Sequence, residues 1–336
     1  MNQDTKFSNS ELSVPTDVAV AIIMRPNREF LLTQRPQGKP YEGYWEFPGG
    51  KLERGEQPLE ALCRELQEEL GIHVNLAYPW VTRIYEYPHA KVRLHFYRVL
   101  SWDGEPHANE NQQMVWQSSH GRLVDPILPA NGPILKALRL PMIYAISNAD
   151  AIGVKSFMKQ LDVALRKGLR FLQLREKNIS AKELRGLARN AVALAHEFGA
   201  VVTVNSHIEL AIESGADGVH FTSRQLYENE TRPDVALLGA SCHNAEELEL
   251  AVKIGADFVV LGPLNTTPSH AALSSLGWEN FSELIGNFPL PALAIGGLQA
   301  TDLTEAWKHG AHGIAMLRAA WPEIKPVTLM PAEVSV

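Results

Sequence analysis

Residues 49–72 contain two glycines upstream of a predicted helix that carries three carboxylates on one face. Pro58 suits the first turn of this helix, where a missing N–H costs nothing, and the twelve residues after it contain neither Gly nor Pro. Glu65, Glu68 and Glu69 follow the spacing i, i+3 and i+4, so their side chains share one face. Like charges this close repel one another by roughly a few tenths of a kcal/mol for each exposed pair.

A hard divalent cation would remove this repulsion. Mg²⁺ binds carboxylate oxygens, keeps several of its waters and is usually shared with substrate phosphates. Gly49 and Gly50 have no Cβ, so a backbone carbonyl there can approach such an ion closely. A solvated acidic helix face is the alternative interpretation, and three glutamates alone do not exclude it.

The whole segment matches one pattern, G-x5-E-x7-R-E-U-x-E-E-x-G-U, where U is a bulky aliphatic residue. Its nine fixed positions are filled by Gly50, Glu56, Arg64, Glu65, Leu66, Glu68, Glu69, Gly71 and Ile72. The segment therefore resembles the Nudix box. The resemblance implies an α+β fold, a mixed sheet with one catalytic helix, and hydrolysis of a nucleoside diphosphate linked to another group with Mg²⁺ or Mn²⁺ as cofactor.

Four shorter segments are similar to the 8-oxo-dGTP diphosphatases within that family. Residues 46–50 read E-F-P-G-G, residues 33–35 end a strand as T-x-R, residues 110–116 match E-x-Q-x3-W and residues 129–133 match P-A-N-x-P. The resemblance implies that metals and the attacking water are held by Gly49 (through its carbonyl), Glu65, Glu68, Glu69 and Glu110. It also implies that the nucleotide substrate is held by Arg35, Phe47 and Asn131.

Each nucleotide-site residue also has a structural interpretation. Phe47 could belong to the core, Arg35 could end a surface strand, and Glu110 could be a solvated loop charge. Asn131 could be a turn residue or a helix N-cap. As a ligand, its amide would offer a donor and an acceptor together to an oxidised base.

Length and composition are those of a two-domain protein. The chain has 336 residues, 45% of them hydrophobic, and a net charge of −7, which argues against a nonspecific grip on nucleic-acid polymers. The two cysteines, Cys63 and Cys242, lie far apart, so a reducing cytoplasm is expected. No apolar run of about 18 residues occurs, so we expect no membrane span, and the polar first residues do not suggest a signal peptide. Homo-oligomerisation is left open.

The expected organisation is a disordered tail at 1–14, a Nudix domain at 15–139, a second domain at 140–325 and a C-terminal tail at 326–336. In the first domain the sequence predicts strands at 17–24, 29–35, 81–87, 91–99 and 114–116 and a closing helix at 132–138. In the second, strand patterns occur at 143–146, 171–174, 201–204, 218–221, 236–239, 258–261, 292–295 and 313–316, with helical patterns between most of them. Alternating strands and helices of this number predict a (β/α)8 TIM barrel.

Functional groups of such a barrel should follow its strands. The candidates at these positions are Gln173, Arg175, Lys177, Asn205, His243, Thr267, Gly296 and Gly297. The two glycines would let backbone N–H groups hold a phosphate. Histidine is the side chain most often used for proton transfer near neutral pH, which makes His243 a candidate for that role. Structural alternatives remain open. His243 could be a loop histidine whose hydrogen bonds are all made within the protein, and Arg175 or Lys177 could form an ion pair at the mouth of the barrel.

Residues 143–321 resemble the thiamine phosphate synthase and thiazole tautomerase superfamily. The matching segments are Q-L-R-E-K at 173–177, G-A-D-G-V-H at 215–220, G-x-S-x-H at 239–243 and A-I-G-G at 294–297. The resemblance implies a thiamine-pathway phosphate ligand in the barrel, and a proton-transfer role for His243. Two acids that hold Mg²⁺ for the departing pyrophosphate in synthases are replaced by Ser206 and Gln225, which predicts altered or lost synthase activity.

Three hypotheses follow. The first is a pyrophosphohydrolase for 8-oxo-dGTP, acting in nucleotide-pool sanitation and DNA repair, fused to a barrel of altered activity. The second is hydrolysis of thiamine-pathway diphosphates coupled to chemistry in the barrel. The third makes the barrel a non-catalytic module that binds a ligand.

Overall fold

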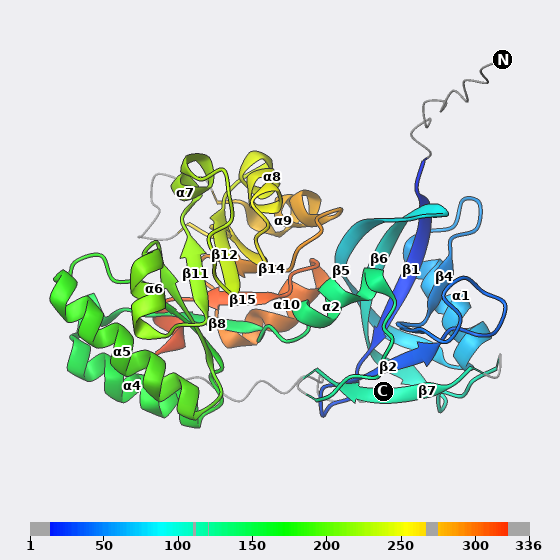
Figure 1. Ribbon diagram of the computed structural model, residues 1–336, viewed down its shortest axis with the longest axis horizontal. Coiled ribbons are helices and arrows are strands. Elements are labelled where there is room, and N and C mark those ends of the chain that lie inside the picture. The colour runs from blue at the N-terminus through cyan, green and yellow to red at the C-terminus, as the bar shows by residue number, and fades with distance from the viewer. Residues whose placement is uncertain (1–13, 110–111, 120, 267–274, 322–336) are drawn as a thin grey trace, which may run out of the picture.

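The computed structural model describes residues 14–109, 112–119, 121–266 and 275–321. Figure 1 shows two bodies side by side, a mixed-sheet domain that contains α1 and a closed barrel that contains β8 to β15. Residues 1–13 and 326–336, expected to form tails, lie outside the described ranges, as do Glu110 and Thr267.

The first domain contains two small sheets. The four-stranded sheet has the order β4-β1-β6-β5, and the three-stranded sheet has the order β3-β2-β7. Strand β1 pairs in parallel with β6 and antiparallel with β4. The strand bounds are β1 Thr16–Ile23, β2 Glu29–Gln34, β3 Trp45–Glu46, β4 Gly49–Lys51, β5 His73–Tyr87, β6 Ala90–Asp103 and β7 Met114–Ser118.

Helix α1 (Pro58–Leu70) follows from local sequence signals. It begins with Pro58 after a capping box made by Gln57 and Glu60, and it ends where Gly71 adopts a left-handed conformation at φ 66°. Its apolar face packs on one side of β1, and this small core contains Ala19, Ala21, Ile23, Ala61, Leu62, Leu66 and Leu70. The alternate residues of β1 face the other core, as the period of a strand requires. The acidic face of α1 is thereby kept out of the core.

Strand β5 is longer than the pattern predicted, because it begins at His73 rather than near residue 81. Pro79 lies within it and cannot donate a ladder hydrogen bond. Because β5 is at the edge of its sheet, it can accommodate a proline. The strand continues past Pro79 with register shifts against β6 between Val74 and Val81.

The chain passes to the barrel through η1 (Pro129–Asn131) and α2 (Gly132–Ala137). Eight parallel strands then close into the predicted barrel, in the order β10-β11-β12-β13-β14-β15-β8-β9. Their bounds are β8 Ile143–Ile146, β9 Phe171–Leu174, β10 Val201–Asn205, β11 Gly218–Phe221, β12 Leu237–Cys242, β13 Phe258–Leu261, β14 Ala292–Ile295 and β15 Gly313–Met316. Six of the eight coincide with the predicted ranges, because a continuous apolar run bounded by glycines or polar residues marks a strand buried on both faces.

Helices surround the barrel between its strands. They are α3 Ala149–Ile152, α4 Val154–Arg166, α5 Ala181–Glu197, α6 Ile208–Ser214, α7 Ser223–Glu228, α8 Ala245–Lys253, α9 Gly277–Ile285 and α10 Leu303–Lys308, with short turns η3 Ala300–Asp302 and η4 Arg318–Ala320. Among the described residues no helix is both long and apolar enough to cross a bilayer.

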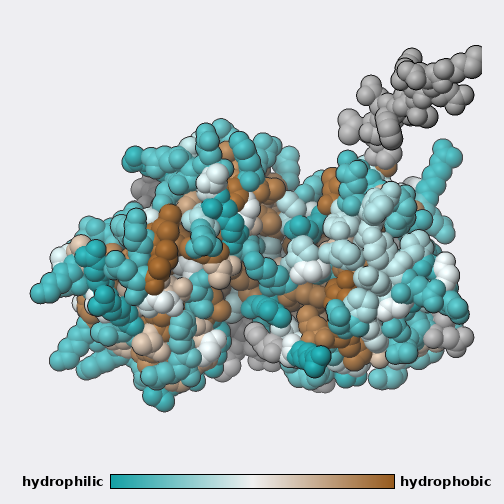
Figure 2. All heavy atoms as spheres, viewed as in Figure 1, coloured by the Kyte–Doolittle hydropathy of each residue, from teal (hydrophilic) through white to brown (hydrophobic). Residues whose placement is uncertain are grey.

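The first domain contacts the amino ends of the barrel strands. Strand β5 and helix α10 lie together between the two bodies in Figure 1, and Thr82 of β5 donates its N–H to the carbonyl of Phe288, which precedes β14. The carboxyl ends of the barrel strands, where a barrel of this type binds its ligands, therefore open away from the first domain. On the visible face, hydrophobic side chains form short streaks within a mostly hydrophilic surface (Figure 2).

Candidate functional site

The two glycines of β4 lie against the acidic face of α1. A Cβ added to Gly50 would lie 2.0 Å from Cδ of Glu65, so the Glu65 carboxylate occupies the space that a side chain would fill. The Gly49 N–H donates to Oε2 of Glu69 at 3.3 Å. At Gly49 φ is +144°, and a Cβ there would lie 2.1 Å from the Ala19 carbonyl oxygen. Position 49 therefore requires glycine, because a side chain there would clash with the backbone of β1.

Arg64 neutralises part of the acidic face. Its guanidinium contacts Oε1 of Glu65 at 2.8 Å and Oε2 of Glu56 at 2.9 Å, and it lies 3.5 Å from Oε2 of Glu68. The hydrogen bonds that Arg64 donates to Glu56 and Glu65 raise the pKa of its guanidinium. The Glu68 side chain is 63% exposed. The three glutamates thus share one face, but Glu65 is paired with Arg64, Glu69 with Gly49, and Glu68 is largely in solvent.

Within the described ranges, no group of three or more His, Cys, Asp or Glu side chains converges as a ready metal site. The donors nevertheless fit a hard divalent cation, because they are carboxylate oxygens. They lie beside two glycines, whose missing side chains leave the backbone open to an ion. Glu110 lies outside the described residues. Its neighbour Asn109 is held on α1, where its N–H donates to the Glu69 carbonyl at 3.0 Å and its Nδ2 donates to the Glu68 carbonyl at 2.8 Å.

The residues expected to hold a nucleotide gather around β3. The Arg35 N–H donates to the Tyr44 carbonyl at 2.8 Å, and the Leu128 N–H donates to the Trp45 carbonyl at 2.9 Å, so β3 joins the end of β2 to the turn that carries Asn131. The Asn131 side chain is 3% exposed, and its Nδ2 has no hydrogen-bond partner within the described structure. An unpartnered buried amide donor is costly, and a ligand that accepts from it would remove that cost.

Arg35 and Phe47 have strong internal contacts. The Arg35 guanidinium binds both oxygens of Glu46, at 2.8 and 2.6 Å. Burial raises the pKa of Glu46, although the charge of Arg35 opposes this effect. Phe47 is 3% exposed and packs against Phe30 and Phe96, with ring centroids 5.6 and 6.4 Å away. Phe47 is therefore part of the core, and little of its ring is accessible to a ligand.

An aromatic cluster beside Arg35 was not anticipated from the sequence. The Tyr41 ring lies 5.4 Å from Tyr87 and 6.1 Å from His89, and Tyr87 stacks on His89 at 5.6 Å. Tyr41 adopts a left-handed backbone conformation with φ 62°, uncommon for a residue with a side chain. Loop residues have no periodicity that would reveal such a cluster; the spacing of tyrosines on β5 was the available signal.

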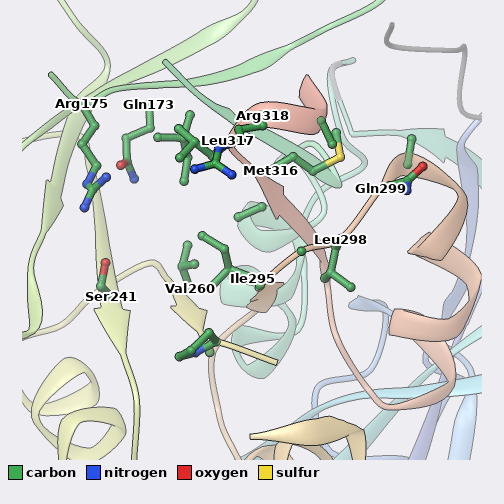
Figure 3. Close-up of a pocket in the computed structure, with 18 of the residues that line it drawn as sticks. Gln173, Arg175, Ser241, Val260, Ile295, Leu298, Gln299, Met316, Leu317 and Arg318 are labelled. Carbon is green, nitrogen blue, oxygen red and sulfur yellow. The ribbon is translucent and has the colours of Figure 1, made fainter. Parts of the chain in front are cut away.

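A cavity of about 790 Å³ opens at the carboxyl ends of the barrel strands. It brings together five of the predicted barrel residues, Gln173, Arg175, His243, Gly296 and Gly297. In Figure 3 the side chains of Gln173, Arg175 and Ser241 point into this space, the first two from the end of β9 and the third from β12. Lys177 and Asn205 line a separate, smaller cavity of about 280 Å³. The predicted barrel residues are therefore divided between two cavities.

The main cavity combines a histidine–carboxylate pair with a glycine turn. Oε2 of Glu247, a residue 8% exposed, accepts from the His243 N–H at 2.7 Å and lies 2.8 Å from His243 Nδ1. At Gly296 φ is +128°, and a Cβ would lie 2.5 Å from the Leu264 nitrogen. Asn265 also fixes this turn, because its Nδ2 donates to the Gly296 carbonyl at 2.9 Å. The geometry suits a phosphate at the glycines and proton transfer at the histidine.

Uncharged groups occupy the positions where synthases carry two metal-binding acids. Gln225 Nε2 donates to the Ser206 carbonyl at 3.0 Å, and Asn205 Nδ2 donates to the Ser206 hydroxyl at 2.7 Å. Ser206 has φ 67° and lines the smaller cavity. The two replaced positions are thus tied to each other by a hydrogen bond between neutral groups, an arrangement that lacks the anionic oxygens Mg²⁺ prefers.

A buried polar network underlies the main cavity. The Tyr144 hydroxyl contacts Thr203 Oγ1, Gln173 Nε2 at 3.1 Å and His220 Nδ1 at 3.3 Å, and His220 Nε2 lies 3.0 Å from Ser241 Oγ. Burial lowers the pKa of His220 to about 3, so its ring is neutral at physiological pH. The network connects β8, β9, β10, β11 and β12 and fixes the polar floor of the cavity.

Comparisons with known proteins identify a family for each of the two domains. The family model "NUDIX domain" matches residues 15–136, and the model "Thiamine monophosphate synthase" matches residues 143–320. The 8-oxo-dGTP diphosphatase of Escherichia coli is 39% identical over 122 residues, which cover 36% of this chain and 95% of that protein.

Two relatives match the barrel over most of their own length. The thiamine-phosphate synthase of Desulfitobacterium hafniense strain Y51 is 30% identical over 189 residues, which cover 55% of this chain and 91% of that protein. A protein of Aquifex aeolicus, provisionally named a thiamine-phosphate synthase, is 34% identical over 185 residues, covering 53% of this chain and 96% of its own length. The chain therefore belongs to the Nudix hydrolase family through its first domain and to the thiamine monophosphate synthase family through its second.

Proposed function

We propose that the first domain is a metal-dependent pyrophosphohydrolase that converts 8-oxo-dGTP to 8-oxo-dGMP and pyrophosphate. The observation that carries this proposal is the contact of Glu65 and Glu69 with the Gly49-Gly50 strand, where no side chain separates the two carboxylates from the backbone. The similarity to the Escherichia coli 8-oxo-dGTP diphosphatase supports the choice of nucleotide. The buried Asn131 amide supports it further, because its Nδ2 can donate to a base oxygen.

Glu65, Glu68, Glu69, Glu110 and the Gly49 carbonyl would hold Mg²⁺ or Mn²⁺. A bound ion of this kind lowers the pKa of its water and offsets the charge of a diphosphate. A glutamate of α1 accepts a proton from the attacking water while the water oxygen bonds to phosphorus. The P–O bond of the anhydride breaks, and pyrophosphate leaves with the bonding electron pair.

Nucleotide binding falls to side chains around β3. Arg35 is oriented by its two contacts with Glu46 and would place its guanidinium beside the substrate. Asn131 would read the oxidised base. Phe47 would support this site from the core, since its ring packs between Phe30 and Phe96.

A substrate panel tests the assignment. Pyrophosphate release should be far faster from 8-oxo-dGTP than from dGTP or thiamine diphosphate, and thiamine diphosphate as the best substrate would favour the thiamine-pathway alternative instead. Glu68→Gln and Glu69→Gln should each abolish turnover with an unchanged melting temperature. Glu283→Gln, an exposed glutamate on barrel helix α9, should leave turnover unchanged. Turnover retained in both α1 variants would contradict the proposed metal site.

For the barrel, we propose binding of a thiamine-pathway phosphate ester, with proton transfer by His243 as a second candidate activity. The His243–Glu247 pair and the Gly296 turn support it, and the neutral Ser206–Gln225 contact argues against release of a metal-bound pyrophosphate. Full-length Glu69→Gln protein separates the two functions. Thiazole-phosphate tautomerisation by this variant that is lost on adding His243→Ala would establish the activity. Binding of the ester without turnover would instead support a non-catalytic module.

A further inference from the structure

One arginine of the first domain is buried against the barrel. Arg98 lies on β6 and is 2% exposed. Its Nη1 donates to the His312 carbonyl at 3.0 Å, and its Nη2 lies 2.8 Å from His312 Nδ1. His312 directly precedes β15 and is 1% exposed. Two residues that are 214 positions apart therefore share a buried polar contact across the domain boundary.

The connecting segment contributes the third member of this contact. His312 Nε2 lies 2.9 Å from the Leu140 carbonyl, which can only accept. The hydrogen-bond network thus assigns the ring proton to Nε2, and Nδ1 is left as an acceptor for Arg98. Burial lowers the pKa of His312 well below its ordinary value, in agreement with a neutral ring. Nudix strand, connecting segment and barrel are linked through one imidazole.

An aromatic ring completes the environment of the cation. The Arg98 guanidinium lies over Trp80 of β5, 4.4 Å from the ring centroid, and Trp80 packs 5.7 Å from the His312 ring. No carboxylate in the described structure is paired with Arg98, and its Nε has no partner there. The charge is thus held by a carbonyl, an imidazole and a π face. The His312 carbonyl and imidazole are supplied only when the domains are docked, whereas the Trp80 ring belongs to the same domain as Arg98.

Further contacts surround this group on the same side of the barrel. Arg83 Nη1 donates to the Pro289 carbonyl at 2.7 Å, and the Tyr78 ring lies 6.3 Å from Trp307. On another edge Lys136 pairs with Asp257 at 2.7 Å. The β5–β6 face therefore covers the amino ends of β14 and β15, and α2 reaches the residue that precedes β13.

We propose that Arg98, His312 and the Leu140 carbonyl form an interdomain lock that makes the two domains unfold as one cooperative unit. The β5–β6 face of the first domain is the docking surface, and its partner is the amino end of the barrel in the same chain. Removing one member leaves the others buried without a partner, which is far more destabilising than losing an exposed ion pair.

Calorimetry and limited proteolysis of the full chain test the lock. The natural sequence should melt in a single transition. Arg98→Met should lower the melting temperature by about 5 °C or more, or split the transition in two, and should speed cleavage within residues 138–142 about tenfold. Adding His312→Leu to Arg98→Met should recover part of the loss, because the pair is then replaced by apolar side chains.

Matched variants keep the test decisive. Arg166→Met removes an exposed arginine paired with Asp162 and should shift the melting temperature by less than about 1 °C. If Arg98→Met does not fold, Arg98→Lys retains the charge without the two-pronged contact and should show an intermediate loss. Two transitions in the natural sequence, or an Arg98→Met protein that melts within about 1 °C of it, would overturn the proposal. None of these readouts depends on hydrolysis, so they stand apart from the assigned activity.

Discussion

Gly50→Ala is expected to inactivate the hydrolase without unfolding it. The new methyl carbon would lie 2.0 Å from Cδ of Glu65 and 2.1 Å from its Oε2, whereas ordinary contacts begin at 3.4 Å. The carboxylate must therefore move by about 3.4 − 2.0 = 1.4 Å. Misplacement of a catalytic group by about 1 Å costs roughly 100-fold in rate, equivalent to about 2.7 kcal/mol in the activation barrier. Because Glu65 is a flexible side chain and φ at residue 50 suits alanine, the fold can adapt.

The assay is kcat for pyrophosphate release from 8-oxo-dGTP at saturating Mg²⁺, together with the melting temperature of the same preparation. The matched control is Gly186→Ala, since a Cβ at this helix position meets nothing within 4 Å and alanine favours a helix by about 1 kcal/mol. The control should keep full activity. A Gly50→Ala protein with kcat within about threefold of the natural sequence would refute the idea that the position of Glu65 limits the reaction.

Three further outcomes are expected. Asn131→Ala should raise KM for 8-oxo-dGTP by about tenfold and KM for dGTP much less, because one hydrogen bond to the oxidised base is lost; equal changes would contradict base reading. Replacing Ser206 and Gln225 together by Asp should create Mg²⁺-dependent pyrophosphate binding in the barrel, measurable by calorimetry, and unchanged binding would show that other groups exclude the metal. The free energy of unfolding should fall as the pH drops from about 6.5 toward 3, because burial lowers the pKa of His220 to about 3 and only the unfolded chain binds a proton there in this range. Denaturant titrations at successive pH values should show a shallower fall for His220→Gln.

Much of the fold could be predicted because its signals are local. Six barrel strands had correct bounds, since buried apolar runs between glycines and polar residues define them. The first eight residues of β5 were missed, because Pro79 argues against a strand unless the strand is known to be at an edge. Edge position depends on pairing across the sheet, which a single segment does not reveal.

The candidate sites were predictable where spacing along one element decides them. Glu65, Glu68 and Glu69 share a face by helical geometry alone. By contrast, the pairing of Arg35 with Glu46 and the separation of Lys177 from Arg175 into different cavities depend on how loops close in space. Arg98 and His312 illustrate the limit, because nothing in either neighbourhood indicates a contact across 214 positions.

The orientation of the barrel decides what the fusion can offer a cell. The β5–β6 face closes one end of the barrel, so the barrel mouth opens away from the first domain. Helix α1 lies on the side of the first domain that is far from the barrel (Figure 1). The first domain thus lies between the two sites, so a small molecule that passes from one to the other has to travel around it. The joined chain does fix the relative amounts of the two domains, because one translation event delivers both in a one-to-one ratio.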